Sequence, residues 1–508
     1  MAYVFLWGEA CYFFMQKKFL KNLFLLLVLN LLIKPFWILG IDRTVQNTVG
    51  PDEYGFYFAI FNFSFLFYIL LDFGITTFNN KNIAQNNHLL NKHLSNIIVL
   101  KLVLFIFYLI FTLGGALFIS YSREQILLLF LLGVNQFLIS FILYLRSNLG
   151  GLHLFRTDSF ISVMDRTLMI TICSVLLWGN VVNDFKIQYF VYAQTTSYSI
   201  TAIITMFLVF RKAEAKFLKL NWSLPFFLMI IRQSFPFAIL VLLMSFYNRI
   251  DSVMLERMLE DGARYSGIYA SAYRLLDAAN MFAYLFAVLL LPIFARMIKQ
   301  KEPIEDLIKL SFTLLIIPAI IVAVACINYS EQLMELLYSM HSGESAAEYK
   351  ERLYLSSRVF GLLMTSFCAI STMYIFSTLL TANGSLKYLN LIAFSGMIIN
   401  IVLNIVLIPR YQAYGSALAT LVTQFLTAAI QVVVVYHVFK FRNNYIYVAK
   451  LLFFLLGVVF IGFASSQLHL DWYLSFVMMI IASILLALVI RLLRPRHLFQ
   501  ILKYGENV

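Results

Sequence analysis

The sequence has few charged residues for its length. Of its 508 residues, 12% are charged and 62% are hydrophobic, whereas a soluble protein carries about 25% charged residues. Hydrophobic runs longer than about 18 residues, the length that predicts a transmembrane helix, recur along the whole chain. This composition excludes an ordinary soluble protein and predicts a membrane protein with many spans.

The usual signatures of metal, nucleotide and covalent chemistry are also missing. No Cys/His cluster has the spacing of a zinc site, and no phosphate-binding Gly-Lys-Ser/Thr loop or nucleophile elbow is present. The four cysteines are scattered through apolar segments, where we expect them to pack as small hydrophobic residues: Cys11, Cys173, Cys326 and Cys368. We therefore expect no metal, no cofactor and no enzymatic activity.

The first fourteen residues do not resemble a signal peptide, because they lack a basic start and a small-residue cleavage site. Basic residues follow Met15 directly, so we expect Met15 to be the natural start and the first span to remain uncleaved. The predicted spans are 22–41, 54–75, 97–120, 124–145, 160–180, 186–210, 226–255, 266–297, 307–328, 353–381, 386–408, 412–438, 446–466 and 472–492.

Loop charge predicts the orientation of these spans. Loops on the same side as the N-terminus carry most of the loop Lys and Arg, which places both termini in the cytoplasm by the positive-inside rule. Much of the net charge of +13 follows from this bias. The charge therefore does not indicate a nucleic-acid partner. We expect a multi-pass protein of the bacterial inner membrane.

A short motif occurs twice. Gly50, Gly55 and Tyr57 precede or enter the second span, and Gly262, Gly267 and Tyr269 repeat this spacing 212 residues later at the eighth span. Repeated halves are common in transporters. We expect an all-α fold with a six-helix bundle at 15–211, a second six-helix bundle at 225–440 and an additional helix pair at 445–495.

Ionisable residues interrupt several of the predicted spans. A charge at the centre of a spanning helix costs about 2.5–3.5 kcal/mol, so such residues are expected to face a bundle interior or a water-filled cavity. Most are cationic, which predicts an anionic passenger. The residues are Lys34, Asp165, Arg166, Arg232, Arg249, Asp251, Arg274, Asp277 and Arg358.

The predicted substrate-binding residues are Lys34, Arg232, Arg249, Asp251, Arg274 and Asp277. We expect Lys34, Arg249 and Arg274 to face one aqueous cavity between the two bundles, where an arginine fork suits a phosphate. Arg274 and Asp277 are three residues apart, so an alternative is that the ions pair with one another and fix helix positions.

Candidate ion-coupling carboxylates are Asp72, Asp251 and Asp277, with a solvated helix end as the alternative for Asp72. Asp165 and Arg166 are sequence neighbours, which predicts different helix faces and no mutual pair.

Polar residues at helical spacing mark one face of four spans. We interpret these stripes as the lining of a sugar-sized cavity made of hydroxyls and amides. The alternative is that they form hydrogen bonds between helices. The four stripes are Gln136, Ser140 and Tyr144; Gln188, Tyr192, Thr195 and Ser199; Tyr374, Thr378 and Thr381; and Thr420, Gln424, Thr427 and Gln431.

Several motifs, in this order, resemble one known family. They are VGPDEYGFY and LLDFGITTF, the segment from NRIDSVMLE to RYSGIYASAYRLLDA, and NIVLNIVLIPRYQAYGSALAT. Together they resemble the polysaccharide-transporter branch, the O-antigen (Wzx-type) flippases, of the multidrug/oligosaccharidyl-lipid/polysaccharide exporter superfamily. The resemblance implies two bundles around a central cationic cavity and places Arg249, Asp251 and Arg274 among its ionic residues, with Lys34 as a looser match.

The resemblance implies movement of an undecaprenyl-diphosphate-linked oligosaccharide from the cytoplasmic to the periplasmic leaflet, by alternating access, for O-antigen, capsule or exopolysaccharide synthesis. Its expected partners are this lipid-linked glycan and membrane lipids, with polysaccharide polymerase machinery left open. One alternative is a drug/cation antiporter of the same fold, although such proteins usually have twelve spans and a more acidic cavity. Another is a membrane polysaccharide polymerase or glycosyltransferase, for which the extramembrane loops are short.

Overall fold

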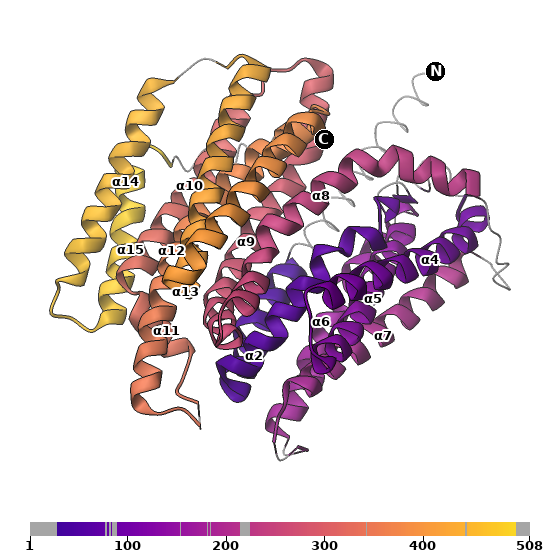
Figure 1. The fold of residues 1–508 in the computed structure, drawn as a ribbon. Helices are drawn as coiled ribbons and strands as arrows, with labels where there is room; N and C mark the ends of the chain where they lie inside the picture. The colour runs from indigo at the N-terminus through magenta and orange to yellow at the C-terminus, as the bar shows by residue number, and fades with distance from the viewer. Residues whose placement is uncertain are drawn as a thin grey trace. The chain divides into compact units, whose positions relative to one another are not determined.

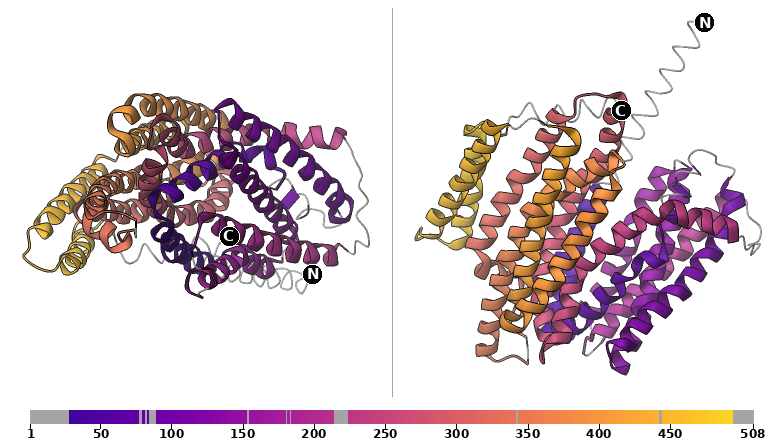
Figure 2. Two further views of the ribbon diagram at one scale, coloured as in Figure 1. Left: turned by 60° about the horizontal axis from the view of Figure 1, so that its bottom comes forward. Right: turned by 45° about the horizontal axis from the view of Figure 1, so that its top comes forward.

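The chain is all-helical in a computed structural model that describes residues 28–76, 79–80, 83, 89–152, 154–179, 181–182, 184–213, 224–341, 343–441 and 444–493 (Figures 1 and 2). The first part of the fold contains η1 (Trp37–Asp42), α2 (Arg43–Leu66), η2 (Tyr68–Leu71), α4 (Leu89–Phe118), α5 (Arg123–Gly151), α6 (Phe155–Trp178), α7 (Ile187–Lys212) and α8 (Leu224–Met258). It continues with α9 (Gly262–Gln300), α10 (Glu305–Asn328), α11 (Ser330–Leu337), α12 (Ala346–Ala382), α13 (Leu386–Phe439), α14 (Tyr445–Ser466) and α15 (Trp472–Val489). The expected start at Met15 lies outside the described residues.

The described helices confirm a polytopic membrane protein. Eleven of them are long and apolar enough to cross a bilayer. These eleven cover the expected spans from the third onward, because α13 alone contains both 386–408 and 412–438. The expected second span corresponds to α2 and η2, which end in a turn at Asp72 instead of one continuous helix.

Two long helices are interrupted by residues with non-helical backbone. In α2 the interruption is Gly50, whose φ of 83° suits glycine because it has no Cβ, and Pro51 follows it. In α13 Pro409 precedes Gln412, which has a φ of 51°. A proline inside a helix removes one backbone hydrogen bond and kinks the helix. The kink in α13 therefore lies where the sequence predicts a turn between two spans.

The chain divides into two compact units, which we describe separately. Unit 1 comprises Met1–Val49 and Phe56–Val253, and unit 2 comprises Gly50–Gly55 and Met254–Val508. The short segment from Gly50 to Gly55 thus packs with the second unit although it precedes most of the first. The bundle boundaries predicted from the repeat remain a prediction.

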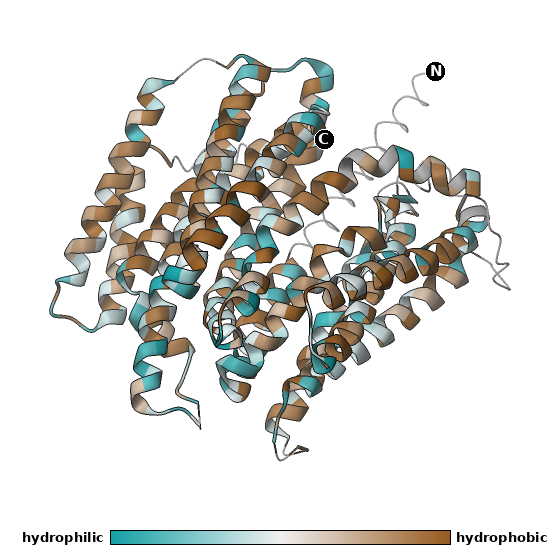
Figure 3. Cartoon of the chain, viewed as in Figure 1, coloured by the Kyte–Doolittle hydropathy of each residue, from teal (hydrophilic) through white to brown (hydrophobic). Residues whose placement is uncertain are grey.

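The extra C-terminal helices pack against α10 in unit 2. Residues of α10, α14 and α15 share one buried cluster that includes Ile317, Val324, Phe454 and Met479. Tyr329, just after α10, donates a 2.8 Å hydrogen bond to Ser465 of α14. The outward faces of α14 and α15 are rich in exposed Leu, Val and Phe, and both helices are among the most apolar parts of the fold in Figure 3. These faces suit contact with lipid.

The two copies of the repeated motif contact each other inside unit 2. A Cβ on Gly55 would lie 1.8 Å from the carbonyl oxygen of Ala263, and one on Gly267 would lie 1.9 Å from that of Pro51. Pro51 and Ala263 are themselves 212 residues apart, so the two contacts are equivalent under the repeat. The backbones cross so closely that only glycine fits, as in other small-residue helix contacts.

The tyrosines of the motif also make comparable bonds, each within its own unit. Tyr57 accepts a 2.8 Å hydrogen bond from Gln194 of α7 in unit 1. Tyr269 lies 3.2 Å from the hydroxyl of Thr420 of α13 in unit 2. In both units the motif tyrosine is therefore joined to a later helix of its own unit, α7 in unit 1 and α13 in unit 2. These contacts explain in physical terms why the glycines and the tyrosine recur together.

Replacing either crossing glycine is expected to destabilise the protein. Gly267→Ala places a methyl group inside the van der Waals radius of the Pro51 carbonyl, so the helices must separate, at a cost of about 1–3 kcal/mol or more. A lower apparent unfolding temperature of the detergent-solubilised protein measures this cost. Gly114→Ala is the matched control, because its Cβ would meet nothing within 4 Å. Equal unfolding temperatures for the two variants would contradict the close crossing.

Candidate functional site: ionic residues in the spanning helices

Lys34 lies in a charged group within unit 1. Its side chain is half-buried, and the charges that act on it are those of Arg166, Asp165 and Arg146. The helix that carries it widens into the π-helical turn η1 directly after Pro35 and Phe36. Such π-helical turns are frequent at functional sites. The structure thus brings Lys34 together with two other ionic residues that the sequence singled out.

Asp165 and Arg166 do pair, so the prediction of no mutual contact is wrong. Arg166 Nε lies 3.7 Å from Asp165 Oδ2. The arginine side chain is long enough to reach around the helix, although adjacent Cβ atoms point in different directions. Arg166 also lies over two aromatic rings, with its guanidinium carbon 5.6 Å from the centroid of Trp37 and 5.8 Å from that of Tyr198. Cation–π contacts of this kind stabilise a partly desolvated arginine.

Arg249 is joined to α2 through an asparagine. Its Nη1 donates to Asn62 Oδ1 at 3.4 Å, and Asn62 Nδ2 donates in turn to Ser252 Oγ at 2.7 Å. The guanidinium carbon lies 5.4 Å from the centroid of Phe65. Asp251 is 1% exposed. Arg232, near the start of the same helix α8, is exposed, so the structure does not bring it into this group.

Arg274 and Asp277 form a separate group in unit 2. Arg274 Nη1 lies 3.6 Å from Asp277 Oδ2, the pair that their spacing allows. Arg274 Nε also donates to the hydroxyl of Tyr54 at 3.1 Å. Tyr54 belongs to the short segment Gly50–Gly55, whose close packing on α9 follows from the glycine crossing. The repeated motif therefore positions a partner for Arg274.

The four polar stripes differ in burial, and the one on α12 is mixed, with Thr378 buried and Tyr374 and Thr381 half-buried. On α7 the stripe is exposed or half-buried, as a cavity-lining face would be. On α5 and the second half of α13 every stripe residue is buried. There Gln136 bonds to Ser64, Ser140 to the Leu71 carbonyl and Tyr144 to the Leu94 carbonyl. For α5 and α13 the cavity interpretation is therefore wrong, because these residues lie inside the helix packing.

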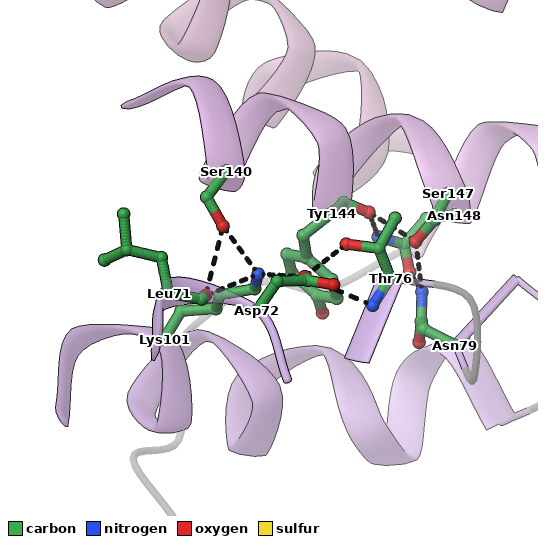
Figure 4. Close-up of polar contacts among 9 residues, drawn as sticks. All are labelled: Leu71, Asp72, Thr76, Asn79, Lys101, Ser140, Tyr144, Ser147 and Asn148. Atoms are coloured by element: carbon green, nitrogen blue, oxygen red, sulfur yellow. Dashed lines mark hydrogen bonds and ion pairs between the residues drawn. The ribbon is translucent and has the colours of Figure 1, made fainter. Parts of the chain in front are cut away.

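Lys101 is a buried ionic residue that the sequence pattern did not single out. Figure 4 shows its ammonium group between Asp72, the Leu71 carbonyl and Ser140, at distances of 2.5, 2.9 and 2.9 Å. The lysine side chain is fully buried, whereas Asp72 is 19% exposed. The helix α4 begins at Leu89 and not near 97. Lys101 therefore lies three turns inside the helix, a depth that the expected span boundary concealed.

Asp72 is therefore paired with a buried counter-charge and is not the solvated helix end that the alternative interpretation proposed. Besides Lys101 it accepts hydrogen bonds from the backbone N–H and hydroxyl of Thr76, at 3.3 and 2.5 Å (Figure 4). Lys101 also bonds to the last carbonyl of η2, at the place where Phe73 and Gly74 take positive φ values. The lysine thus stabilises both a buried charge and the turn after η2.

Solved structures of several transporters share this fold. The lipid II flippase MurJ, in an inward closed conformation, matches with a TM-score of 0.68 and 14% identity over 95% of this chain and 98% of that chain. An inward-facing multidrug resistance MATE family transporter matches with 0.59 and 13% identity over 82% and 100%. A MOP superfamily transporter from Pyrococcus furiosus, described as having a binding pocket of reverse polarity, matches with 0.57 and 15% over 82% and 94%.

These similarities define the fold as that of the MOP superfamily transporters, as expected from the sequence. The family model for polysaccharide biosynthesis proteins matches residues 19–298, more than half of the chain. The chain therefore belongs to the polysaccharide biosynthesis protein family. No curated protein matches it significantly.

Removal of the Lys101 charge is expected to destabilise unit 1. Lys101→Met leaves Asp72 without its ion-pair partner, and loss of one member of a buried pair costs about 3–5 kcal/mol. The double variant Lys101→Met with Asp72→Asn removes both charges and should recover most of the unfolding temperature. A double variant no more stable than Lys101→Met alone would show that the pair is not the source of the stability.

Proposed function

We propose that this protein is a flippase that transfers an undecaprenyl-diphosphate-linked oligosaccharide from the cytoplasmic to the periplasmic leaflet by alternating access. Such a step supplies lipid-linked units for O-antigen, capsule or exopolysaccharide synthesis. Membership of the polysaccharide biosynthesis protein family and the fold shared with the lipid II flippase support this function. Transfer breaks no covalent bond, so the proposal includes no catalytic residue and no cofactor.

The main observation in favour of this function is that two arginines of the spanning helices donate hydrogen bonds to side-chain oxygen atoms. Arg249 is held by Asn62 in unit 1, and Arg274 by Tyr54 in unit 2. The asparagine and the tyrosine orient the two guanidinium groups, and Arg274 also lies 3.6 Å from Asp277, from which a bound phosphate would draw it away. Guanidinium groups bind phosphate through paired hydrogen bonds. We propose Arg249 and Arg274 as contacts of the substrate diphosphate and Lys34 as a further cationic contact.

The drug/cation antiporter is the less favoured function. The MATE transporter structure matches over its full length but covers 82% of this chain, less than the 95% that the lipid II flippase covers. The ionic residues of the spanning helices are mostly cationic, which opposes a cationic passenger. The pocket of reverse polarity described for the Pyrococcus furiosus transporter is consistent with different functions on this fold. A polymerase or glycosyltransferase is not favoured by the fold.

The proposal also places the protein in the bacterial inner membrane with both termini in the cytoplasm. The expected partners are the lipid-linked oligosaccharide diphosphate and membrane lipids, and polysaccharide polymerase machinery is left open. Nucleic acid is not among them, since the positive-inside bias accounts for the loop charge. We also propose Arg232 and Asp251 as residues of the substrate site, of which Arg232 is exposed and Asp251 is buried.

Substitution of the two arginines should stop transfer while the protein still inserts. Arg249→Ala or Arg274→Ala removes a charge-assisted phosphate contact worth about 1.5–3 kcal/mol, a factor of ten or more in affinity. The measurement is the amount of lipid-linked glycan exposed on the periplasmic face of cells that depend on this protein. Arg→Lys should restore transfer in part, since the charge remains and the fork is lost.

Arg296→Ala is the control for that experiment. Arg296 lies on the same helix as Arg274 but near its other end, where it bonds to Gln300 and is half-buried. It should export glycan at the wild-type level. Wild-type export by both Arg249→Ala and Arg274→Ala would contradict their assignment to the diphosphate. Loss of export by all three variants would point to a general defect in folding.

Two driving forces for transfer lead to different results in vesicles. A diphosphate with about two negative charges gains roughly 4.6 kcal/mol from a 100 mV potential if fully transferred, at about 2.3 kcal/mol per charge. The competing mechanism is proton or sodium exchange at Asp251, Asp277 or Asp72. Asp277 is the favoured site, because phosphate binding would draw Arg274 away and leave this carboxylate to take a cation.

We expect transfer to slow when ion gradients are collapsed at constant potential, and Asp277→Asn to remove this dependence. Asp72→Asn is a useful comparison, because its carboxylate is already paired with buried Lys101. Transfer that is unaffected by the gradients would exclude carboxylate exchange. Transfer that is unaffected by the potential at constant gradients would exclude the electrical mechanism.

A further inference from the structure

Arg358 of α12 lies between two tyrosine rings in unit 2. Its guanidinium carbon is 4.4 Å from the centroid of Tyr414 on α13 and 5.6 Å from that of Tyr354, one turn earlier on α12. Its Nη1 also donates to the hydroxyl of Tyr354 at 3.3 Å. Arg358 is exposed, and Tyr354 is 59% exposed. The two rings hold the guanidinium in place at the surface of the unit.

The charge of Arg358 is not balanced by a carboxylate among the residues that the structure describes. Other arginines have such partners: Arg146 with Asp158, Arg166 with Asp165, Arg274 with Asp277 and Arg352 with Glu344. Arg352 is six residues earlier on the same helix, and its side chain is bound to both oxygens of Glu344 at 2.8 Å. Arg358 therefore differs from its neighbour in having only aromatic and hydroxyl contacts.

The sequence places Arg358 at the edge of the apolar part of the membrane. The run 359–382 that follows contains no Asp, Glu, Lys or Arg. At about 1.5 Å per residue it measures roughly 36 Å, enough to cross a hydrocarbon core of about 30 Å. Arg358 therefore lies at the edge of the apolar run and not inside it, as the expected span 353–381 had placed it. This edge is the interfacial layer, the depth at which lipid phosphates lie. Tyrosine is typical of this layer.

The adjacent helix α13 has the same pattern at the same end. The run 388–409 is also free of charged residues and ends at Arg410 and Tyr411, beside the kink at Gln412. Tyr411 is 52% exposed, and Tyr414 follows within one turn. Two arginines and three tyrosines therefore mark one interfacial level of unit 2, and the loop charges predict that this level is on the non-cytoplasmic side.

We propose that Arg358, held by Tyr354 and Tyr414, binds the phosphate of a lipid headgroup at the non-cytoplasmic interface. The guanidinium provides a planar set of donors that matches phosphate oxygens. The exposed ring of Tyr354 provides an apolar surface for the glycerol or sugar next to that phosphate. Two lipids share this chemistry: an anionic phospholipid of the outer leaflet and the lipid-linked diphosphate after transfer. The second source rests on the proposed function.

Lipid binding by the purified full chain tests the site. Wild type and variants in detergent are titrated with phosphatidylglycerol and, separately, with undecaprenyl diphosphate, and bound lipid is measured by native mass spectrometry. Arg358→Gln should weaken the tightest binding event at least about tenfold. Arg358→Lys should have an intermediate effect, because it retains the charge without the fork. Tyr414→Leu should resemble Arg358→Lys, since the guanidinium loses its closer ring.

Arg296→Gln is the matched control, because it removes a half-buried arginine of the same unit that lies outside the proposed lipid site. It should bind both lipids as wild type does. Equal weakening of both lipids by Arg358→Gln identifies a general phospholipid site, and selective weakening of undecaprenyl diphosphate identifies a release site for the transferred lipid. Wild-type affinity of Arg358→Gln for both lipids would overturn the proposal. The assay contains no transport step. Its result therefore tests lipid binding at Arg358 even if the protein does not transfer a lipid-linked oligosaccharide.

Discussion

The requirement that an ionised side chain in hydrocarbon has a partner shapes most of this structure. Removing a charge from water is costly, and the cost is met only when counter-charges and hydrogen bonds replace the lost hydration. Lys101 illustrates the rule, since its ammonium group has a carboxylate, a carbonyl and a hydroxyl as partners. The same requirement explains the turn after η2, because that turn presents Asp72 and the Leu71 carbonyl to the lysine.

Close helix packing depends on small residues and on buried polar contacts. The crossing of Gly55 and Gly267 brings Tyr54 to the face of α9 that carries Arg274. A larger residue at either glycine would separate the two segments and lengthen this contact. The repeat is therefore more than a trace of sequence duplication. It creates a backbone crossing whose geometry supplies a polar partner to one of the proposed substrate-binding arginines.

The sequence predicts the fold better than it predicts the site. Hydrophobic runs and short motifs can be recognised from the sequence alone. The helices, the membrane class and the family that they predict are confirmed. Individual contacts depend on where helices begin and how they rotate, which local pattern does not determine. Lys101 was missed because α4 starts earlier than its apolar run suggests. The stripes on α5 and α13 were misread because hydroxyls and amides at helical spacing look the same whether they face water or another helix.

Ion-pair geometry separates two kinds of charged residue in the spanning helices. Lys101–Asp72 and Arg146–Asp158 have close contacts of 2.5 and 2.7 Å between different segments, which tie those segments together. Arg166–Asp165 and Arg274–Asp277 are longer, at 3.7 and 3.6 Å, and each joins residues of one helix. Coulomb attraction falls with distance, and a pair on one helix does not hold two segments together. A phosphate can therefore replace the carboxylate in a pair of the second kind without separating packed helices. Replacing the carboxylate in a pair of the first kind would break a contact between two segments. Arg274–Asp277, which joins two predicted substrate-binding residues, is of the second kind, the arrangement that suits reversible binding of an anionic lipid headgroup, whereas the predicted carboxylate Asp72 belongs to the first kind.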